Sequence, residues 1–460
     1  MSAPVPREPD GSDLDPDLAT PGRGGAVLFG LIWLGGFGML QWSVVRFRVV
    51  IVLTLTVAAM LLALWLIRRS RFALSPTAAA VALSGSAPIA VLVPLWSYLP
   101  AGTERALCVV FAVAAVTCAV LIRIRRSPAL IWGSALATYL VAGAVAIRTD
   151  PHPRIDVWVT LQQAADALAH GRNFYSVIWV DSPGVKDAFT YLPWSAVLLS
   201  PGRLLAGDVR WMLLVWVIVA AVGMWLLGRD RAPATAAAAS ALILLAPGTL
   251  TQIDQAWTEP LLLAGLVWWA VLMVRGHAWW SILPLALACA SKQHLAAVLL
   301  VLLVWRPFGW RRALATAGLT GALIAPWALT APADFVHDTI TFLVTFHPIK
   351  FANTWYLLAL NEFGVTLPFW ATGLVVGTTL AVALWAVNRR SPQIGEVVRW
   401  AALVLFVANL VNKQAFYNQY WLVGALVALS LLLDRTPVIP PPAGTDPTPA
   451  ARGPRRRSRD

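Results

Sequence analysis

Residues 49–67, VVIVLTLTVAAMLLALWLI, form an unbroken apolar run that ends at Arg68. A helix rises about 1.5 Å per residue, so a run of this length covers the roughly 30 Å hydrocarbon core of a bilayer. Only helices and closed barrels satisfy their backbone in lipid, and a run this continuous predicts a helix. Residues 106–121 and 367–387 repeat the pattern. The chain therefore reads as a protein of many membrane-spanning helices.

The composition supports that fold class. The chain has 460 residues, of which 59% are hydrophobic and 12% charged, with a mean hydropathy of +0.71. Soluble domains carry about 25% charged residues, so a soluble protein is excluded. A net charge of +13 is compatible with nucleic-acid binding. However, the basic residues occur in short clusters between apolar runs and in the tail 452–459, which is the positive-inside pattern of membrane proteins. We expect no nucleic-acid partner.

The basic clusters predict the topology. They mark cytoplasmic turns at Arg68, Arg69 and Arg71; Arg123, Arg125 and Arg126; Arg229 and Arg231; Arg306, Arg311 and Arg312; and Arg389 and Arg390. Placing them inside predicts about fourteen crossings, near 26–42, 47–67, 76–99, 104–122, 128–147, 208–227, 232–248, 258–274, 278–290, 294–305, 313–330, 366–388, 397–412 and 417–433. Both termini are then cytoplasmic, in a multi-pass protein of the cell membrane.

Two short apolar runs flank residues 291–294 and leave alternatives open. A single interrupted helix would put Arg275 and Arg306 on opposite sides of the membrane, which the charge rule disfavours. A hairpin that does not fully cross, buried in protein, satisfies the rule. In either arrangement we expect Lys292 at membrane depth or at the outer rim.

Four regions follow from these patterns. Residues 1–25 are acidic and rich in proline and predict a disordered cytoplasmic tail, and 434–460 predict a basic one. Residues 26–127 predict an N-terminal addition of four helices with little polar chemistry, and 128–433 the main membrane domain. Asp13, Asp15 and Asp17 form an Asp-x-Asp pattern, but in a tail of this composition it does not predict a metal site. The cysteines lie in apolar runs and behave as small hydrophobes.

Two long polar loops, 148–206 and 331–366, fall on the outer side, and long ordered loops usually carry function. In the first, Trp158, Leu161, Ala165 and Leu168 recur at helical spacing, with Asp156 at the start and Gly171 as a stop. This predicts an amphipathic helix on the outer leaflet. Residues 191–206, which contain two prolines, predict a second surface helix.

Asp156 is the carboxylate to which we give most weight. Beside the membrane and under amphipathic helices, a carboxylate can accept a proton in a site partly shielded from water. An Asp at a helix start is also often no more than a cap worth about 1 kcal/mol. Spacing alone favours the cap.

Three short motifs in this order resemble a known family. They are Asp156-Val157-Trp158 with Leu168-Ala169-His170-Gly171-Arg172-Asn173-Phe174-Tyr175, then Phe189-Thr190-Tyr191-Leu192-Pro193-Trp194, then Ser291-Lys292-Gln293-His294. They resemble the polyprenyl-phosphate-dependent membrane glycosyltransferases of GT-C type, and most of all the actinobacterial mannosyltransferase-like branch, glycosyltransferase family 87. The resemblance covers roughly residues 128–433. This sequence departs from the pattern in its four preceding helices and in His294, where we expect Pro.

The resemblance implies a GT-C helical bundle that transfers mannose or another sugar, with inversion, from a polyprenyl monophosphate to a glycolipid or glycan of the cell envelope. Asp156 would be the general base. Cations would stabilise the leaving phosphate, and the candidates are Lys292, His294, Arg154, Lys350 and Lys413. No cofactor or metal is expected. For Lys292, snorkelling to the interface is an equal alternative. For His294, the alternative is a simple polar role at a helix start.

Further residues are candidates for contacts with substrate. They are Trp158, Tyr175, Tyr191, Asp254, Glu259, Asn418 and Tyr420. Asp254 and Glu259 equally fit a solvated turn, and Asn418 an interfacial position. The 24 tryptophans by themselves indicate bilayer interfaces rather than sugar stacking.

Two other functions remain open. A transporter or lipid flippase is also a basic bundle of many helices, but it tends to carry ionisable groups near the bilayer centre and broken helices. Here the ionisable residues gather outside, which favours surface chemistry. A scaffold that has lost activity is the third alternative.

Overall fold

The computed structural model describes residues 23–68 and 74–436. Within these residues every regular element is helical. The elements are α1 (Arg23–Ser43), α2 (Val49–Arg68), α3 (Pro76–Leu92), α4 (Ala101–Arg123), α5 (Pro128–Thr149), α6 (Asp156–Ala169), η1 (Phe174–Ser176), α7 (Pro193–Ala206), α8 (Arg210–Gly228), α9 (Pro233–Leu244), α10 (Thr251–Asp254), α11 (Glu259–Val274), α12 (Ile282–Cys289), η2 (Gln293–Leu295), α13 (Ala296–Leu303), α14 (Gly309–Thr330), α15 (Pro332–Val336), η3 (His337–Thr341), α16 (Phe342–Thr345), α17 (Trp355–Phe363), α18 (Phe369–Arg390), α19 (Ile394–Val411) and α20 (Tyr417–Leu433).

The predicted tails lie almost wholly outside the described residues, and so do the Asp-x-Asp pattern, Arg69 and Arg71. At the N-terminal side, α1 begins at Arg23, just inside the stretch predicted as tail. At the C-terminal side, α20 ends at Leu433, where the second tail was predicted to start.

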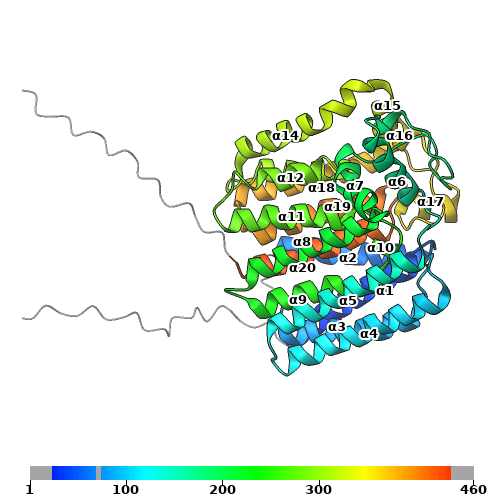
Figure 1. Ribbon diagram of the computed structural model, residues 1–460. Coiled ribbons are helices and arrows are strands. Elements are labelled where there is room, and N and C mark those ends of the chain that lie inside the picture. Colours follow the sequence, from blue (N-terminus) through cyan, green and yellow to red (C-terminus); the bar gives the residue numbers. More distant parts are fainter. Residues whose placement is uncertain (1–22, 69–73, 437–460) are drawn as a thin grey trace, which may run out of the picture.

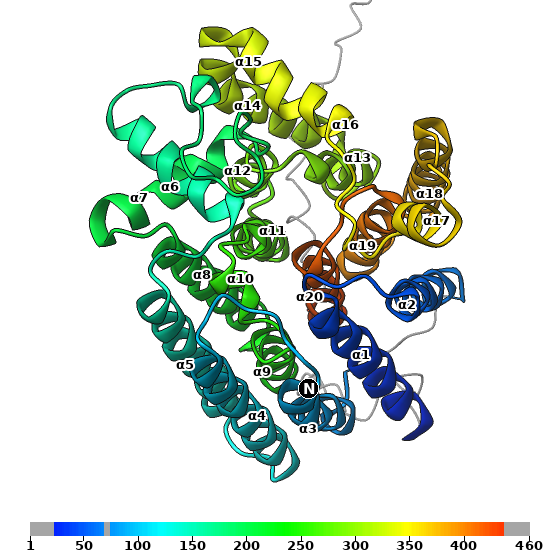
Figure 2. The same cartoon turned by 90° about the vertical axis from the view of Figure 1, so that its right-hand side faces the viewer.

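The long helices run side by side, and the bundle has two unlike ends (Figures 1 and 2). The helix α5 runs from one end to the other, because the basic turn 123–126 precedes it and the first long loop follows it. We call these the arginine end and the loop end. The helices α6, α10, α15, α16 and α17 gather at the loop end (Figure 1). Basic turns and polar loops are thus segregated, as the charge pattern predicted.

Among residues 23–68 and 74–436, seven helices are long and apolar enough to cross a membrane, namely α2, α4, α5, α8, α14, α18 and α19. The protein is therefore helical and suited to a membrane, as predicted. Every segment predicted as a crossing is occupied by a helix, but several are short. The number of crossings, fourteen, stays a prediction.

The short helices α12 and α13 form a hairpin. The Arg312 guanidinium at the start of α14 lies 5.4 Å from the ring of Trp279, which precedes α12. Trp305, just after α13, packs on Trp269 in the second half of α11, with ring centroids 6.1 Å apart. The chain therefore enters α12 and leaves α13 at the arginine end. The two segments therefore form a hairpin and not a single interrupted helix, and its depth in the membrane stays a prediction.

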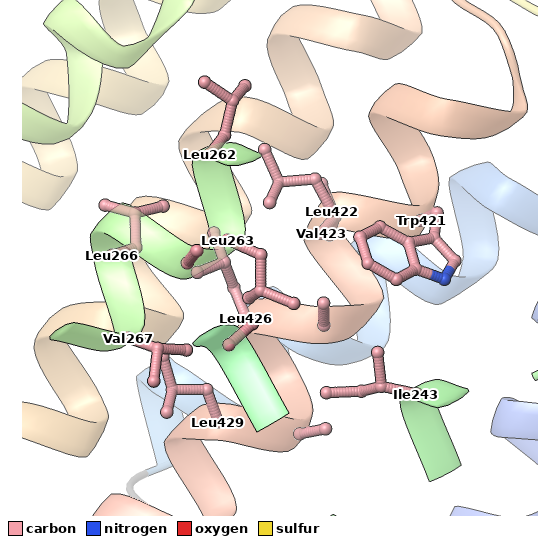
Figure 3. Packing of buried hydrophobic residues seen from close by; sticks show 14 of the residues in the cluster. Ile243, Leu262, Leu263, Leu266, Val267, Trp421, Leu422, Val423, Leu426 and Leu429 are labelled. Atoms are coloured by element: carbon pink, nitrogen blue, oxygen red, sulfur yellow. The ribbon is translucent and has the colours of Figure 1, made fainter. Parts of the chain in front are cut away.

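The centre of the bundle is an apolar contact of α9, α11 and α20 (Figure 3). Leu262, Leu266 and Val267 of α11 face Leu422 and Leu426 of α20, and all of them are buried. Between helices in a membrane, such a contact is stabilised by close van der Waals packing rather than by the exclusion of water. This core holds the N-termini of α11 and α20 at fixed positions beneath the loop end.

Both surface helices predicted in the first long loop are present. The helix α6 ends as predicted, with Gly171 in the left-handed region at φ +63°. It begins at Asp156 itself, so Ile155 and not Asp156 occupies the cap position. The second helix, α7, has Pro193 in its first turn, where no backbone N–H is needed.

Candidate functional site

Asp156 stands at the first turn of α6, at the loop end. Its Oδ1 accepts a hydrogen bond of 2.8 Å from the N–H of Val157. Burial raises the pKa of its carboxyl above the ordinary value, and backbone N–H groups of Val157 and Val185 offset part of the rise. A carboxylate with a raised pKa is a stronger base. The raised pKa of Asp156 is therefore compatible with a role in proton transfer, and its carboxylate does not cap α6.

The segment 182–186 covers Asp156 closely. A Cβ built on Gly184 would lie 2.8 Å from Oδ2 of Asp156, closer than real Cβ atoms come to other atoms. Glycine is therefore needed here for backbone approach rather than for an unusual φ angle. The loop holds the carboxylate by contact and by the Val185 N–H.

A buried ion pair lies at the tip of the α12–α13 hairpin. Lys292 Nζ is 2.5 Å from Oε1 of Glu259, the first residue of α11. The second carboxylate oxygen, Oε2, accepts a 2.8 Å hydrogen bond from Nδ2 of Asn418, at the start of α20. The Glu259 side chain is fully buried, and that of Lys292 is 10% exposed. Three of the predicted site residues thus meet in one cluster.

Tyr191 joins this cluster to Asp156. Its ring centroid is 5.3 Å from Lys292 Nζ, a cation–π contact. Burial first, and then the charges of Asp156 and Glu259, raise the pKa of its phenol well above the ordinary value. Tyr191 therefore stays protonated, with the Lys292 ammonium beside its ring and the Asp156 carboxylate near enough to act on its phenol.

The ion pair lies below the surface of the loop end. Trp194 relates the hairpin tip to a position along α14. Its backbone N–H donates to Ala290 O (3.1 Å), two residues before Lys292, and its ring N–H donates to Leu323 O (2.9 Å) in α14. Leu323 precedes the end of α14, Thr330, by about two turns, or about 10 Å. Since α14 is long enough to cross a membrane, the charges of Glu259 and Lys292 lie within its length. Glu259, which was expected on an outer turn, therefore lies deeper in the bundle than predicted, whereas Lys292 was expected at membrane depth or at the outer rim.

A second polar cluster, near Asp156, joins the predicted residue Asp254 to Ser97 and Tyr98, which were not predicted. Asp254 Oδ2 accepts hydrogen bonds from Ser97 Oγ (2.9 Å) and from the N–H of Tyr98 (3.3 Å). Burial raises the pKa of Asp254 to about 6. Burial, and then the charges of Asp156 and Asp254, also raise the pKa of Tyr98. The link between α3 and α4 therefore contributes to the site, although 26–127 was predicted to carry little polar chemistry.

The only signal for these residues in the sequence is the polar pair Ser97-Tyr98 inside an aromatic link between two apolar runs. Such a link is also typical of a bilayer interface, so spacing does not distinguish the two.

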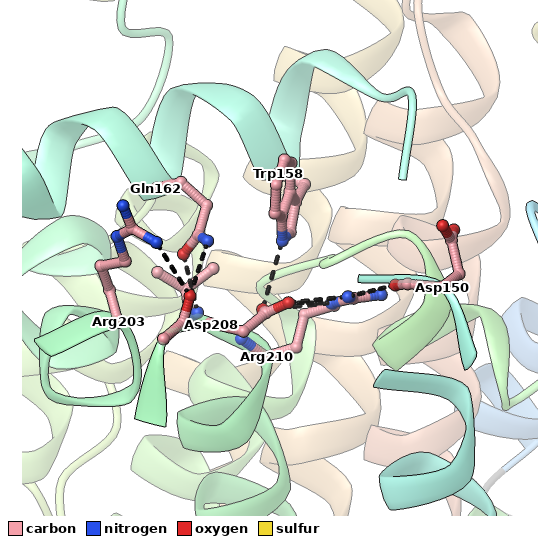
Figure 4. A network of polar contacts seen from close by, with 8 residues as sticks. Asp150, Trp158, Gln162, Arg203, Asp208 and Arg210 are labelled. Carbon is pink, nitrogen blue, oxygen red and sulfur yellow. Dashed lines mark hydrogen bonds and ion pairs between the residues drawn. The ribbon is translucent and has the colours of Figure 1, made fainter. Parts of the chain in front are cut away.

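Trp158 belongs to a separate cluster, which we call the clamp (Figure 4). Its ring N–H donates to Asp208 Oδ1 (3.2 Å), and Asp208 pairs with the fully buried Arg210 at 2.7 Å. One turn further along α6, Gln162 accepts a bond from the N–H of Val209 (2.9 Å). The clamp therefore fixes α6, and with it Asp156, to the start of α8. Trp158 is engaged here rather than beside the Asp156 carboxylate.

Three other predicted residues hold loops in place. Tyr175 is buried, and its hydroxyl donates to Tyr191 O (2.8 Å). The Tyr420 hydroxyl donates to Asn353 O (2.8 Å), and Lys413 Nζ donates to Val344 O (2.7 Å). These contacts position the backbone of the loop end and leave the three polar groups engaged by protein.

The remaining predicted cations differ in their surroundings. His294 is half-buried near Lys292. Arg154 is exposed but close enough for its charge to lower the pKa of Tyr98. Lys350 is exposed in the second loop, where its carbonyl accepts from Asn361 (3.0 Å). The structure brings Arg154 and His294 to the site and does not connect Lys350 with it.

The two long loops are bonded to each other over the site. Asp338 Oδ2, in the second loop, accepts a 2.7 Å bond from the N–H of Phe189. Gln293 Nε2 donates to Thr190 O (3.0 Å), next to Tyr191.

In the part of the chain that the structure describes, no group of three or more His, Cys, Asp or Glu side chains is arranged to hold a metal ion.

Comparison with known proteins gives no family for this chain, because no protein-family model and no curated protein matches it.

Proposed function

We propose that this chain is an inverting glycosyltransferase with a GT-C architecture of about fourteen crossings. It would move mannose or another sugar from a polyprenyl monophosphate to a glycolipid or glycan of the cell envelope. The loop end would face outward, and both termini would be cytoplasmic. The observation that carries the proposal is that Asp156 and Lys292 both lie near Tyr191, beneath the loop end.

Each group has a role in such a transfer. Asp156 accepts the proton of an acceptor hydroxyl while that oxygen attacks the anomeric carbon. The bond from the anomeric carbon to the phosphate oxygen breaks, and its electron pair leaves with the phosphate monoester. Lys292 and His294 lie where a cation or donor would stabilise that charge. Asp254 and Tyr98, which lie near Asp156, would bind hydroxyl groups of the substrates.

Membrane depth supports the choice of a lipid-linked donor. Lys292 lies within the length of α14, whose side chains Leu314 and Leu329 are exposed and apolar. A phosphate on a membrane lipid reaches such a cation from the side, whereas a soluble donor has to enter from the loop end.

A transporter or flippase is the second candidate, and one observation favours it. A buried Glu–Lys pair at the tip of a hairpin of two short helices is the kind of intramembrane charge that transporters use. Transport does not explain why the loop at Gly184 covers the Asp156 carboxylate outside the bundle.

Lipid and glycan profiling of a deletion strain separates the two. A glycan or glycolipid that lacks one sugar supports transfer and names the acceptor, while an accumulated solute or lipid on one side of the membrane supports transport. Complementation with Asp156→Asn then tests the base. We expect normal abundance and a loss of transfer of at least about a thousandfold.

Asp187→Asn is the matched control, since it makes the same change on an exposed carboxylate of the same loop. Near-normal transfer by Asp156→Asn, or an equal loss in both variants, would end the assignment of Asp156 as base.

A further inference from the structure

The surroundings of Lys292 carry an inference that rests on the proposed function and extends it. In the structure its ammonium is already paired, at 2.5 Å, with a carboxylate. A phosphate that approaches Nζ would therefore meet Glu259 there. Two anions on one ammonium in a buried site repel each other strongly, because the effective dielectric constant is low.

Glu259 is well placed to lose this partner. It is the first residue of α11, where the helix dipole stabilises a negative charge. Its other oxygen keeps the 2.8 Å bond from Asn418. Removing one member of a buried pair usually leaves an uncompensated charge, but here two other stabilising contacts remain.

Lys292 is equally able to change partner. An ammonium has three N–H donors, and Glu259 accepts from one of them in the structure. The ring face of Tyr191 stays beside Nζ at 5.3 Å from its centroid. The Lys292 side chain is 10% exposed, whereas the Arg210 side chain of the clamp is fully buried. Asp208 and Arg210 therefore have no such freedom.

We propose that Glu259 is the resting counter-ion of Lys292 and that the phosphate monoester of a membrane lipid replaces it at Nζ on binding. In the free protein, Glu259 neutralises the buried Lys292 ammonium while no ligand is bound. On binding, the Lys292 ammonium gives up its contact with the Glu259 carboxylate and contacts the phosphate instead. Glu259 keeps its hydrogen bond from Asn418 and its place at the N-terminus of α11. Glu259 is thus a positioning residue that competes with the lipid.

Binding of farnesyl phosphate to the full chain in nanodiscs tests this exchange. We expect Glu259→Gln, which removes the competing charge, to bind the phosphate about tenfold more tightly than wild type. Lys292→Met should bind about tenfold more weakly. The double variant should bind no more tightly than Lys292→Met, because the gain needs the ammonium. Farnesol, which has no phosphate, should not distinguish the variants.

Equal or weaker binding by Glu259→Gln would overturn the exchange, and so would a gain that persists without Lys292. If Glu259→Gln does not fold, Glu259→Asp decides. It keeps the charge but withdraws it by one methylene, and about threefold tighter binding is expected. Equal or weaker binding by this variant would also overturn the exchange.

The two proposals fail in different ways. Tighter, Lys292-dependent binding by a chain that transfers no sugar would leave the exchange standing and remove the proposed function. Normal transfer with no gain in Glu259→Gln would do the reverse. Absence of phosphate binding in wild type and in Glu259→Gln would overturn the exchange.

Discussion

Two buried ion pairs lie at the loop end, and they are built in opposite ways. Asp208 and Arg210 are neighbours in the chain, and Asp208 accepts from Arg210 through Nε and Nη2 and from Trp158 as well. Glu259 and Lys292 come from different helices and share one hydrogen bond. A pair tied by several hydrogen bonds fixes a shape, whereas a pair joined by one hydrogen bond can exchange with a ligand. The clamp therefore supports the fold, and the hairpin tip serves the site.

The largest effect is expected from breaking the clamp. Asp208→Ala leaves the Arg210 guanidinium buried without its anion, which should lower the free energy of unfolding by about 3–5 kcal/mol. Thermal unfolding of the purified protein in detergent measures the loss. Asp230→Ala, in an exposed pair of 3.5 Å with Arg229, should leave stability unchanged. A stable but inactive Asp208→Ala would contradict the division between clamp and site.

A smaller effect, on activity alone, is expected at Gly184. The Cβ of Gly184→Ala would press on the Asp156 carboxylate, and a displacement of about 1 Å costs up to about a hundredfold in rate. Gly184 is exposed in a loop, so the melting temperature should stay near wild type. Gly102→Ala is the control, since nothing lies within 4 Å of its added Cβ. Full activity in Gly184→Ala would mean that the loop does not hold Asp156.

The smallest effect is a pH dependence of stability that depends on Asp254. Burial raises its pKa to about 6 in the fold, above the ordinary value of an Asp carboxyl, so the folded state binds the proton more strongly. Stability from this group is therefore present at low pH and is lost as pH rises towards and through 6. Melting temperatures at pH 4 to 7 should fall less steeply in Asp254→Asn than in wild type. Equal slopes would show that Asp254 does not titrate in this range.

Much of the architecture follows from local properties of the chain. Apolar runs and basic turns placed the helices, because lipid demands a hydrogen-bonded backbone and charge rules act on short loops. The residue spacing after Asp156 predicted α6, and Gly171 predicted its end. By contrast, Trp158, Tyr420 and Lys413 were predicted as substrate contacts, and the structure engages them in holding α6 and the loops.

The sequence by itself determined a helical membrane protein with polar loops at one end, since hydropathy and helix rise depend only on neighbouring residues. The tertiary structure alone decided that Glu259 neutralises Lys292 and that the α3–α4 link brings Tyr98 to Asp254. These contacts join segments that are far apart in the chain. Their partners are set by helix packing and by the short lengths of α11, α12 and α13, which no local pattern records.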